Sequence, residues 1–439
     1  MDPFAYLPAH LPVAPRPLVG ELLSSWLGRL AAANALGFGE LLELVHQRLA
    51  LLRAGPFDAG RLDYACSGPL LKTLSTLSRL PATSIAALSL KRRFGALGLF
   101  WFNHDTYLFY NAQHRLIPRP QILPSYCAEC LREQAQQGQA AHLRVEWALA
   151  FLTHCPRHRL GLWSCCPDCR DMASMGWGLG RGQPPTRGCR RCALRPWIAF
   201  LEPPQPLSRR QERVLALEAA LLGAVGGEGS APRAPDPGWV GAVRPADFVR
   251  LVSELLEMLG WPDARGGFSL LEHLQRGSCR APEEVWRPLP VGSEPFGALG
   301  RQGRFELLAG VVELLGIGLG EDKPSGNPAP FGCLYGPMSA SRRGAFFERL
   351  KSWPERVRVK ALAAARSFKT PEPRCSEKKK EDRGRGRPTK WQRIARKAST
   401  GEENLDTLAS QIGCKRGGVL RELTPKWAFK CAASRMNCK

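Results

Sequence analysis

Four paired half-sites decide the fold of this chain: CAEC at residues 127–130, CPRH at residues 155–158, CPDC at residues 166–169 and CRRC at residues 189–192. This stretch holds eight of the fifteen cysteines of the chain. In a Cys-x-x-Cys turn the two sulfur atoms project to the same side, so one tetrahedral ion binds both. Four pairs so close together favour metal over a redox motif. The alternative is a set of buried thiols that bind nothing.

The half-sites combine in chain order into two closed sites. The first two half-sites are separated by 24 residues. The last two are separated by 19 residues, which is the spacing of a zinc ribbon or knuckle pair. Four ligands complete the coordination shell of zinc, so we expect two structural Zn²⁺ ions. The eight expected ligands are Cys127, Cys130, Cys155, His158, Cys166, Cys169, Cys189 and Cys192.

Three neighbouring side chains leave the ligand assignment open. His154 precedes Cys155 and Cys165 precedes Cys166, so either is able to replace the assigned ligand. His142 lies off the paired spacing. We expect it to be a surface residue or an outer partner of a ligand, because a lone histidine is more often satisfied by hydrogen bonds than by metal.

The sequence favours a protein without catalytic activity. A catalytic zinc needs an open position and a nearby acid or base, and the chain has no His-Glu-x-x-His motif. The zinc-deaminase signature also fails, because His142 and Glu146 are four residues apart instead of two. No Gly-Lys-Ser/Thr loop is present to bind a nucleotide phosphate. A carboxylate cluster for Mg²⁺, which assembles only in the fold, is not excluded by spacing.

The charge of the 439-residue chain points to a polyanionic partner. Lys and Arg outnumber Asp and Glu by 62 to 39, which gives a net charge of +23 and makes nucleic acid the expected partner. No run of about 18 apolar residues and no dominant basic amphipathic helix is present, so we expect no membrane partner. The first residues lack the basic start and apolar core of a signal peptide, and a cytoplasmic location follows.

Helical periodicity is present before the cysteine stretch. One face of the first expected helix carries Leu18, Leu22, Trp26, Leu30 and Ala33. After a break at residues 36–39, a second helix would bury Leu41, Leu44, Val45 and Leu49, and the pair has the form of a helix-turn-helix. A third short helix is expected near Thr83, with the threonine hydroxyl as its cap.

The same periodicity returns after the cysteine stretch, at residues 207–225, 246–259, 305–315 and 342–350. The expected fold class is therefore mainly α, in four parts. Residues 1–118 would form a helix-turn-helix-like N-terminal domain, and residues 119–200 a small double zinc-ribbon or knuckle segment. Residues 201–370 would form a helical C-terminal domain, and residues 371–439 a basic tail.

The tail holds two motifs that point to DNA. Residues 371–439 carry 18 Lys plus Arg against 8 Asp plus Glu. An Arg-Gly-Arg-Pro core within them resembles an AT-hook, whose arginines lie in a narrow A·T-rich minor groove. Residues 405–423 have the apolar pattern of a helix-turn-helix. The alternative for the AT-hook-like motif is a solvated basic linker. The expected DNA contacts are Arg383, Arg385, Arg387, Lys390, Lys415, Arg416 and Arg421.

Residues beyond the expected ligands carry a family resemblance. CAECLRE at residues 127–133, Arg144-x-x-Trp147 before the second half-site, and PRPLVGELLSSWLGRLA at residues 15–31 resemble the TniQ and TnsD family of transposition proteins. The resemblance spans roughly residues 10 to 200 and includes all eight expected ligands. It implies that the N-terminal helices contact protein, and it implies a place at the nucleoid of the bacterial cytoplasm.

The resemblance also implies a function and partners. Members of this family assist a transposase, like TniA or TnsB, and an AAA+ ATPase, like TniB or TnsC, in choosing a target site; some contact DNA directly and some dock on an RNA-guided complex. We therefore expect a non-catalytic transposition accessory protein. The alternative is a zinc-containing DNA-binding transcription regulator, which the tail by itself would permit.

Overall fold

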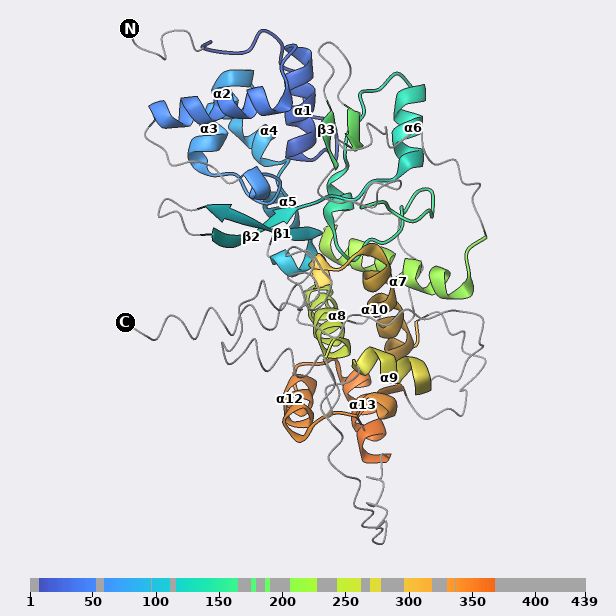
Figure 1. Cartoon of the computed structure of the whole chain (residues 1–439). Coiled ribbons are helices and arrows are strands. Elements are labelled where there is room, and N and C mark those ends of the chain that lie inside the picture. Colours follow the sequence, from blue (N-terminus) through green and yellow to red (C-terminus); the bar gives the residue numbers. More distant parts are fainter. Residues whose placement is uncertain are drawn as a thin grey trace, which may run out of the picture. The chain divides into compact units, whose positions relative to one another are not determined.

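The computed structural model of the chain describes residues 8–52, 59–95, 97–110, 116–164, 175–178, 186–189, 206–226, 243–261, 269–277, 296–317, 330–335 and 337–367. All of them belong to the first of the two units into which the chain divides, residues 1–370 and residues 371–439. The described part is mainly helical, with two small antiparallel sheets, so the expected mainly α class is confirmed (Figure 1).

The N-terminal helices enclose a core of their own. They are α1 (Leu23–Ala33), α2 (Phe38–Leu51), η1 (Ala59–Arg61), α3 (Gly68–Ser78) and α4 (Ala82–Ala86). Trp26 of α1, Leu41 of α2 and Leu74 of α3 are fully buried in this core. Each such side chain stabilises the fold by ~1.5–3 kcal/mol relative to an exposed one. The two helices expected from the sequence therefore pack as part of a larger cluster.

Local signals explain where α3 begins and ends. The Oγ atom of Ser67 accepts a hydrogen bond from the backbone of Leu70, and a proline in the first turn has the φ angle that a helix needs. Arg79 ends the helix in the left-handed conformation, with φ at 56°. The expected cap at Thr83 is wrong. The N-cap of α4 is Pro81, no side chain caps this helix, and Thr83 lies inside it.

The middle of the described chain alternates short helices and strands. Its elements are α5 (Leu90–Phe94), η2 (Leu99–Trp101), β1 (His104–Tyr110), β2 (Leu116–Ile122), α6 (Ala128–Gln136), η3 (Val145–Ala148), β3 (Met175–Gly178) and β4 (Thr186–Cys189). β1 pairs with β2, His104 opposite Ile122, and β3 pairs with β4, Met175 opposite Cys189. The β1–β2 pair thus lies between the N-terminal helices and the first half-site.

The C-terminal helices of the described part follow the expected periodicity and add three α-helices and one 3-10 helix. They are α7 (Arg209–Gly226), α8 (Pro245–Leu259), α9 (Leu270–Gly277), η5 (Phe296–Ala298), α10 (Arg301–Leu315), α11 (Pro330–Tyr335), α12 (Ala340–Leu350) and α13 (Glu355–Ser367). The four expected ranges correspond to α7, α8, α10 and α12 and differ from them only at the ends. No helix in the described ranges combines the length and the apolar character needed to span a bilayer.

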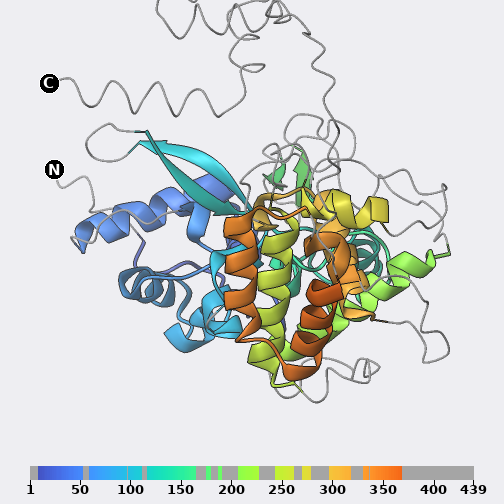
Figure 2. The same ribbon diagram turned by 90° about the horizontal axis from the view of Figure 1, so that it is seen from below.

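Close contacts hold the C-terminal helices together. α8 and α12 lie side by side, and Arg349 of α12 donates to Glu257 of α8 over 2.8 Å (Figure 2). Gly310 of α10 faces α8 and α9, where a Cβ atom would lie 2.7 Å from Leu271 and 2.9 Å from Leu259. A larger residue at position 310 would force these helices apart, because interiors are close-packed.

One apolar core joins the middle of the chain to the C-terminal helices. Trp147 and Phe151, which flank the second half-site on its N-terminal side, belong to the same buried cluster as Leu217 of α7 and Leu308 of α10. The segment that carries the cysteine half-sites therefore does not depend on a metal alone for its position. The limits of the four expected domains stay predictions.

Candidate metal centre

Backbone pairing brings the first two half-sites together. Cys127 is the N-cap of α6 and Cys130 lies in its first turn. The residue before this helix, Tyr126, exchanges two backbone hydrogen bonds with Trp163, at 2.8 and 2.9 Å. Trp163 follows the second half-site, so the residue before the first half-site is paired with a residue that follows the second.

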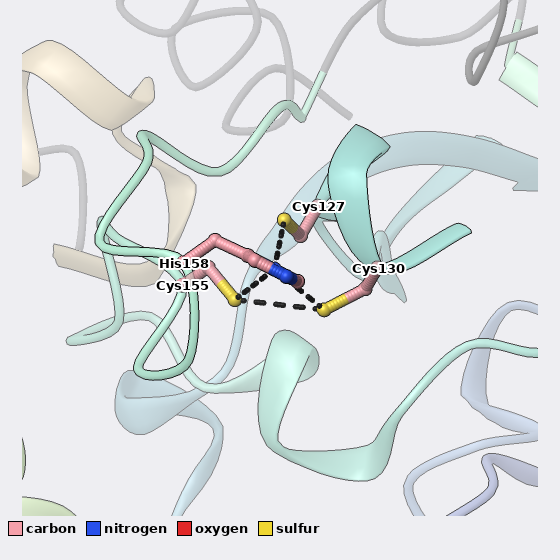
Figure 3. Close-up of side chains that lie close together, drawn as sticks. All are labelled: Cys127, Cys130, Cys155 and His158. Carbon is pink, nitrogen blue, oxygen red and sulfur yellow. Dashed lines mark hydrogen bonds between the residues drawn. The ribbon is translucent and has the colours of Figure 1, made fainter. Parts of the chain in front are cut away.

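A tight turn presents the second half-site. The amide of Cys155 donates to the carbonyl of Leu160 at 2.7 Å, and the amide of Arg159 donates back to Cys155 at 2.8 Å. Arg159 has a φ of 59°, a left-handed conformation that costs a residue other than glycine about 1–2 kcal/mol. The turn places the side chains of Cys155 and His158 on the side that faces α6 (Figure 3).

The four side chains have the geometry of a tetrahedral metal site. One ligand atom from each of Cys127, Cys130, Cys155 and His158 lies within 4.8 Å of all the others (Figure 3). Nδ1 of His158 is 3.5 Å from Sγ of Cys127, 3.2 Å from that of Cys130 and 3.7 Å from that of Cys155. Sγ of Cys130 is 3.6 Å from Sγ of Cys155. Zinc bonds of about 2.3 Å to sulfur and about 2.0 Å to nitrogen require edges of about 3.8 and 3.5 Å.

The protonation of the three thiols also matches a cation site. Hydrogen bonds from Cys127 and Cys130 lower the pKa of Cys155. The pKa of Cys130 is raised, chiefly by its hydrogen bond to Cys127. The hydrogen bond to Cys130 lowers the pKa of Cys127, but the hydrogen bond to Cys155 and burial outweigh it and raise this pKa to about 12. A divalent ion would let all three thiols ionise.

The ligand set is closed and buried. Cys127, Cys130 and Cys155 are each less than 5% exposed. Three cysteines and one histidine complete the shell of zinc, which leaves no position for a substrate or a reactive water. The residues fit a structural ion, whose chemistry is to hold α6 against the turn at residues 155–160.

A carboxylate supports the histidine ligand. Nε2 of His158 lies 3.1 Å from Oε1 of Glu133, which is on the same helix as Cys130. The other oxygen of Glu133 is 2.9 Å from Arg157. A carboxylate behind a metal-bound imidazole fixes the ring and raises its basicity. Sequence analysis missed Glu133, although its position three residues after Cys130 places both on one helix face.

The structure decides between the alternative histidines. His154 is turned away from the cysteine cluster: its Nδ1 lies 2.9 Å from Oγ1 of Thr153 and 3.5 Å from Glu218 of α7. His142 is half-buried with Nδ1 3.2 Å from the carbonyl of Ala140, and burial lowers its pKa. Neither histidine belongs to the group that is able to hold a metal.

Only part of the second ligand set lies in the described chain. The backbone of Cys189 ends β4, opposite Met175 of β3. Cys165, Cys166, Cys169 and Cys192 lie outside the described residues, as does the side chain of Cys189. The second zinc site therefore stays a prediction.

The expected DNA contacts in the tail also stay predictions. Arg383, Arg385, Arg387, Lys390, Lys415, Arg416 and Arg421 all lie outside the described residues. In the N-terminal helices, Arg29 of α1 and Arg48 of α2 have partners in the fold. Arg29 is buried and donates to Glu21 at 2.7 and 2.8 Å, and Arg48 donates to the carbonyl of Pro8. This favours a structural role for both.

Comparison with known families agrees with the resemblance seen in the sequence. The TniQ family model matches residues 12–162, a range that contains α1 to α6 and all four residues of the described metal centre. No curated protein matches the chain. Residues 12–162 therefore form a TniQ domain, which covers about a third of the chain.

Proposed function

We propose that this chain is a non-catalytic accessory protein of DNA transposition that helps to select or recruit the target site for a transposase and an AAA+ ATPase. The observation that carries the proposal is the TniQ domain at residues 12–162. A TniQ domain marks a transposition-associated accessory protein. The finer role, in target-site choice, is our inference, and we place it at the nucleoid of the bacterial cytoplasm.

The residues of each part of the chain support a different role for that part. The metal centre supports a scaffold, because a Cys₃His set leaves no open coordination position for catalysis. The net charge of +23 supports DNA as a partner, with the basic tail as the main contact. A second zinc ion in the later cysteine pairs would complete the scaffold. The transposase and an RNA-guided complex are further partners that such a role permits.

The N-terminal part is the proposed contact for a protein partner. Six large apolar side chains are exposed in the described residues, and four of them lie between residues 13 and 52. Leu51 and Leu52, at the end of α2, are 49% and 50% exposed and adjacent in sequence. Clustered exposed apolar side chains mark protein contacts more often than isolated ones do.

A pull-down tests the proposal. The tagged full-length chain is recovered from cells that carry the neighbouring genes, bound proteins are identified by mass spectrometry, and zinc is measured in the same sample. We expect an AAA+ ATPase in the wild-type sample and its loss with Leu51→Ser plus Leu52→Ser, at unchanged zinc content. Val359→Ser, which changes an apolar side chain 55% exposed on α13, is the control and should keep the ATPase. Recovery of specific promoter DNA without an ATPase would support a transcription regulator instead.

A further inference from the structure

Residues 59–103 expose only positive charge. This segment, which runs from η1 to η2, contains six Lys or Arg and one acidic residue, Asp63. Asp63 is buried, and its carboxylate accepts hydrogen bonds from the amide and the hydroxyl of Ser24, both at 2.7 Å. The basic residues, in contrast, are all exposed. They are Arg61, Lys72, Arg79, Lys91, Arg92 and Arg93.

Four of these cations are held in one region by backbone and ring contacts. The amide of Lys91, in the first turn of α5, donates to the carbonyl of Tyr64 at 2.9 Å. The guanidinium of Arg61 lies over the ring of the same tyrosine, with Cζ 5.5 Å from the ring centre. Arg92 and Arg93 follow Lys91 in α5. The four cations, which we call the basic surface, are Arg61, Lys91, Arg92 and Arg93.

The basic surface differs from other exposed cations of the described residues in having no carboxylate partners. On the C-terminal helices, Arg244, Arg250 and Lys351 lie 2.7, 2.9 and 2.6 Å from a carboxylate oxygen. Within the described ranges, no side chain of the basic surface has an ion pair or a hydrogen-bond partner. Neighbouring like charges repel one another, and a bound polyanion removes that repulsion.

The surroundings of the basic surface favour duplex DNA over other anionic partners. A membrane surface requires apolar side chains that insert beside the cations, and a protein interface has an apolar centre. None of the six large apolar side chains exposed in the described residues belongs to residues 59–103. Single strands stack their bases on exposed aromatic rings, whereas the ring of Tyr64 is covered by Arg61. A duplex requires only cations that meet its phosphates.

We propose that the basic surface binds the phosphate backbone of duplex DNA. This contact positions the duplex without reading its sequence, because every nucleotide carries the same phosphate. It would hold DNA against the TniQ domain, in addition to the contacts expected from the tail. The proposal rests on the accessory function proposed above and deepens it, since it names a surface for the DNA partner.

Two full-length variants of equal net charge test the surface. The test variant removes three cations of the basic surface: Lys91→Gln, Arg92→Gln and Arg93→Gln. The control variant removes three exposed cations outside it: Arg244→Gln, Arg250→Gln and Lys351→Gln. The affinity of each for a labelled duplex of mixed sequence is measured by fluorescence anisotropy over a range of salt concentrations. Zinc content and thermal unfolding report whether each variant is folded.

The test variant should bind the duplex at least about tenfold more weakly than the wild type does. Its salt slope, the change of log affinity with log salt concentration, should be smaller by about 2 to 3, since each phosphate contact contributes about 0.9. The control variant should resemble the wild type in both quantities. Equal affinities and equal slopes for the two variants would overturn the proposal.

A charge-retaining variant separates loss of charge from loss of fold. Arg92→Lys with Arg93→Lys should keep the salt slope of the wild type, because an ammonium group also binds phosphate. A reduced slope in this variant, at wild-type zinc content and thermal stability, would contradict a backbone contact. If the test variant does not fold, Arg92→Gln alone should lower the slope by about one, and an unchanged slope would overturn the proposal.

The pull-down described above distinguishes failure of this surface from failure of the accessory function. The test variant should still recover the AAA+ ATPase, because its changed residues are expected to contact DNA. Loss of the ATPase at unchanged duplex affinity would overturn the proposal in favour of a protein contact. Absence of the ATPase from the wild-type sample would contradict the accessory function, while the duplex measurement would still decide whether the basic surface binds DNA.

Discussion

Oε1 of Glu218, on α7, lies 2.9 Å from the backbone nitrogen of Thr153, two residues ahead of the metal ligand Cys155. The other oxygen of Glu218 accepts from the amide of His154 at 3.3 Å, and the hydroxyl of Thr153 donates to Oε1 as well. The whole carboxylate is buried. A side chain of the C-terminal helices therefore accepts hydrogen bonds from the backbone that leads into the turn at residues 155–160, which carries two of the candidate metal ligands.

This relationship predicts that Glu218 stabilises the fold. Glu218→Gln should lower the free energy of unfolding by about 2 kcal/mol, because neutral hydrogen bonds replace charged ones and one amide loses its acceptor. The nearby buried Arg304, whose pKa desolvation lowers to about 9, would also lose a compensating charge. Chemical denaturation measures the effect. Glu257→Gln, in an ion pair whose glutamate is 55% exposed, is the control and should change stability by less than about 0.5 kcal/mol.

The described metal centre predicts a specific loss on removal of one ligand. Substitutions of residues that only contact a ligand lower metal affinity by roughly 10- to 100-fold. Cys130→Ser removes a ligand itself, so it should lower zinc affinity by more than this and should destabilise both α6 and the turn at residues 155–160. Cys66→Ser is the matched control. Cys66 is a half-buried thiol outside the cluster, and desolvation raises its pKa to about 12. Zinc content and thermal unfolding report both variants, and a zinc-replete Cys130→Ser protein would show that the assignment is wrong.

The carboxylate behind His158 predicts a smaller effect. Glu133→Gln should lower zinc affinity by about 10- to 100-fold, because the imidazole loses a partner that orients it and raises its basicity. Glu129→Gln, on the same helix, removes a carboxylate that faces Arg132 instead. Competition with a chromophoric chelator measures both. Equal affinities for the two variants would remove Glu133 from the site.

The thiol pKa values predict how zinc binding depends on pH. The raised pKa values of Cys127 and Cys130 keep these two thiols protonated at neutral pH when no metal is bound. Zinc must displace two protons, so its affinity should rise about 100-fold between about pH 7 and about pH 8 and fall as the solution becomes acidic. Chelator competition at each pH tests this, and an affinity that does not change with pH would contradict it.

The AT-hook-like motif predicts a loss of DNA affinity without a loss of fold. Arg385→Ala with Arg387→Ala should weaken binding to an A·T-rich duplex at least about tenfold, because two minor-groove contacts are removed. Zinc content and thermal unfolding should match the wild type. A G·C-rich duplex, whose minor groove is wider, is the control ligand. Its affinity, measured by fluorescence anisotropy, should fall less from wild type to variant than that of the A·T-rich duplex. Equal affinity of wild type and variant for the A·T-rich duplex would exclude the motif.

Sequence reasoning was most accurate where the signal is local. Residues 207–225, 246–259, 305–315 and 342–350 were expected to be helical because apolar residues recur at a period of 3.6, and α7, α8, α10 and α12 follow these ranges. Sequence reasoning was wrong about the residue that caps one helix and about the end of one buried helix face. Thr83 does not cap α4, because Pro81 already occupies the N-cap. Ala33 is exposed, because the buried face of α1 ends at Ala31.

The sequence by itself predicted that Cys127, Cys130, Cys155 and His158 form one group able to hold an ion, because each half-site is a short turn whose spacing sets the direction of its side chains, and the structure brings these four side chains together. Only the tertiary structure decided that His154 faces Glu218 and that Glu133 stands behind His158. These contacts depend on how the metal-site turn packs against α6 and α7. The spacing of residues within a half-site sets the direction of its own side chains, but it does not say which residues of other elements will contact them.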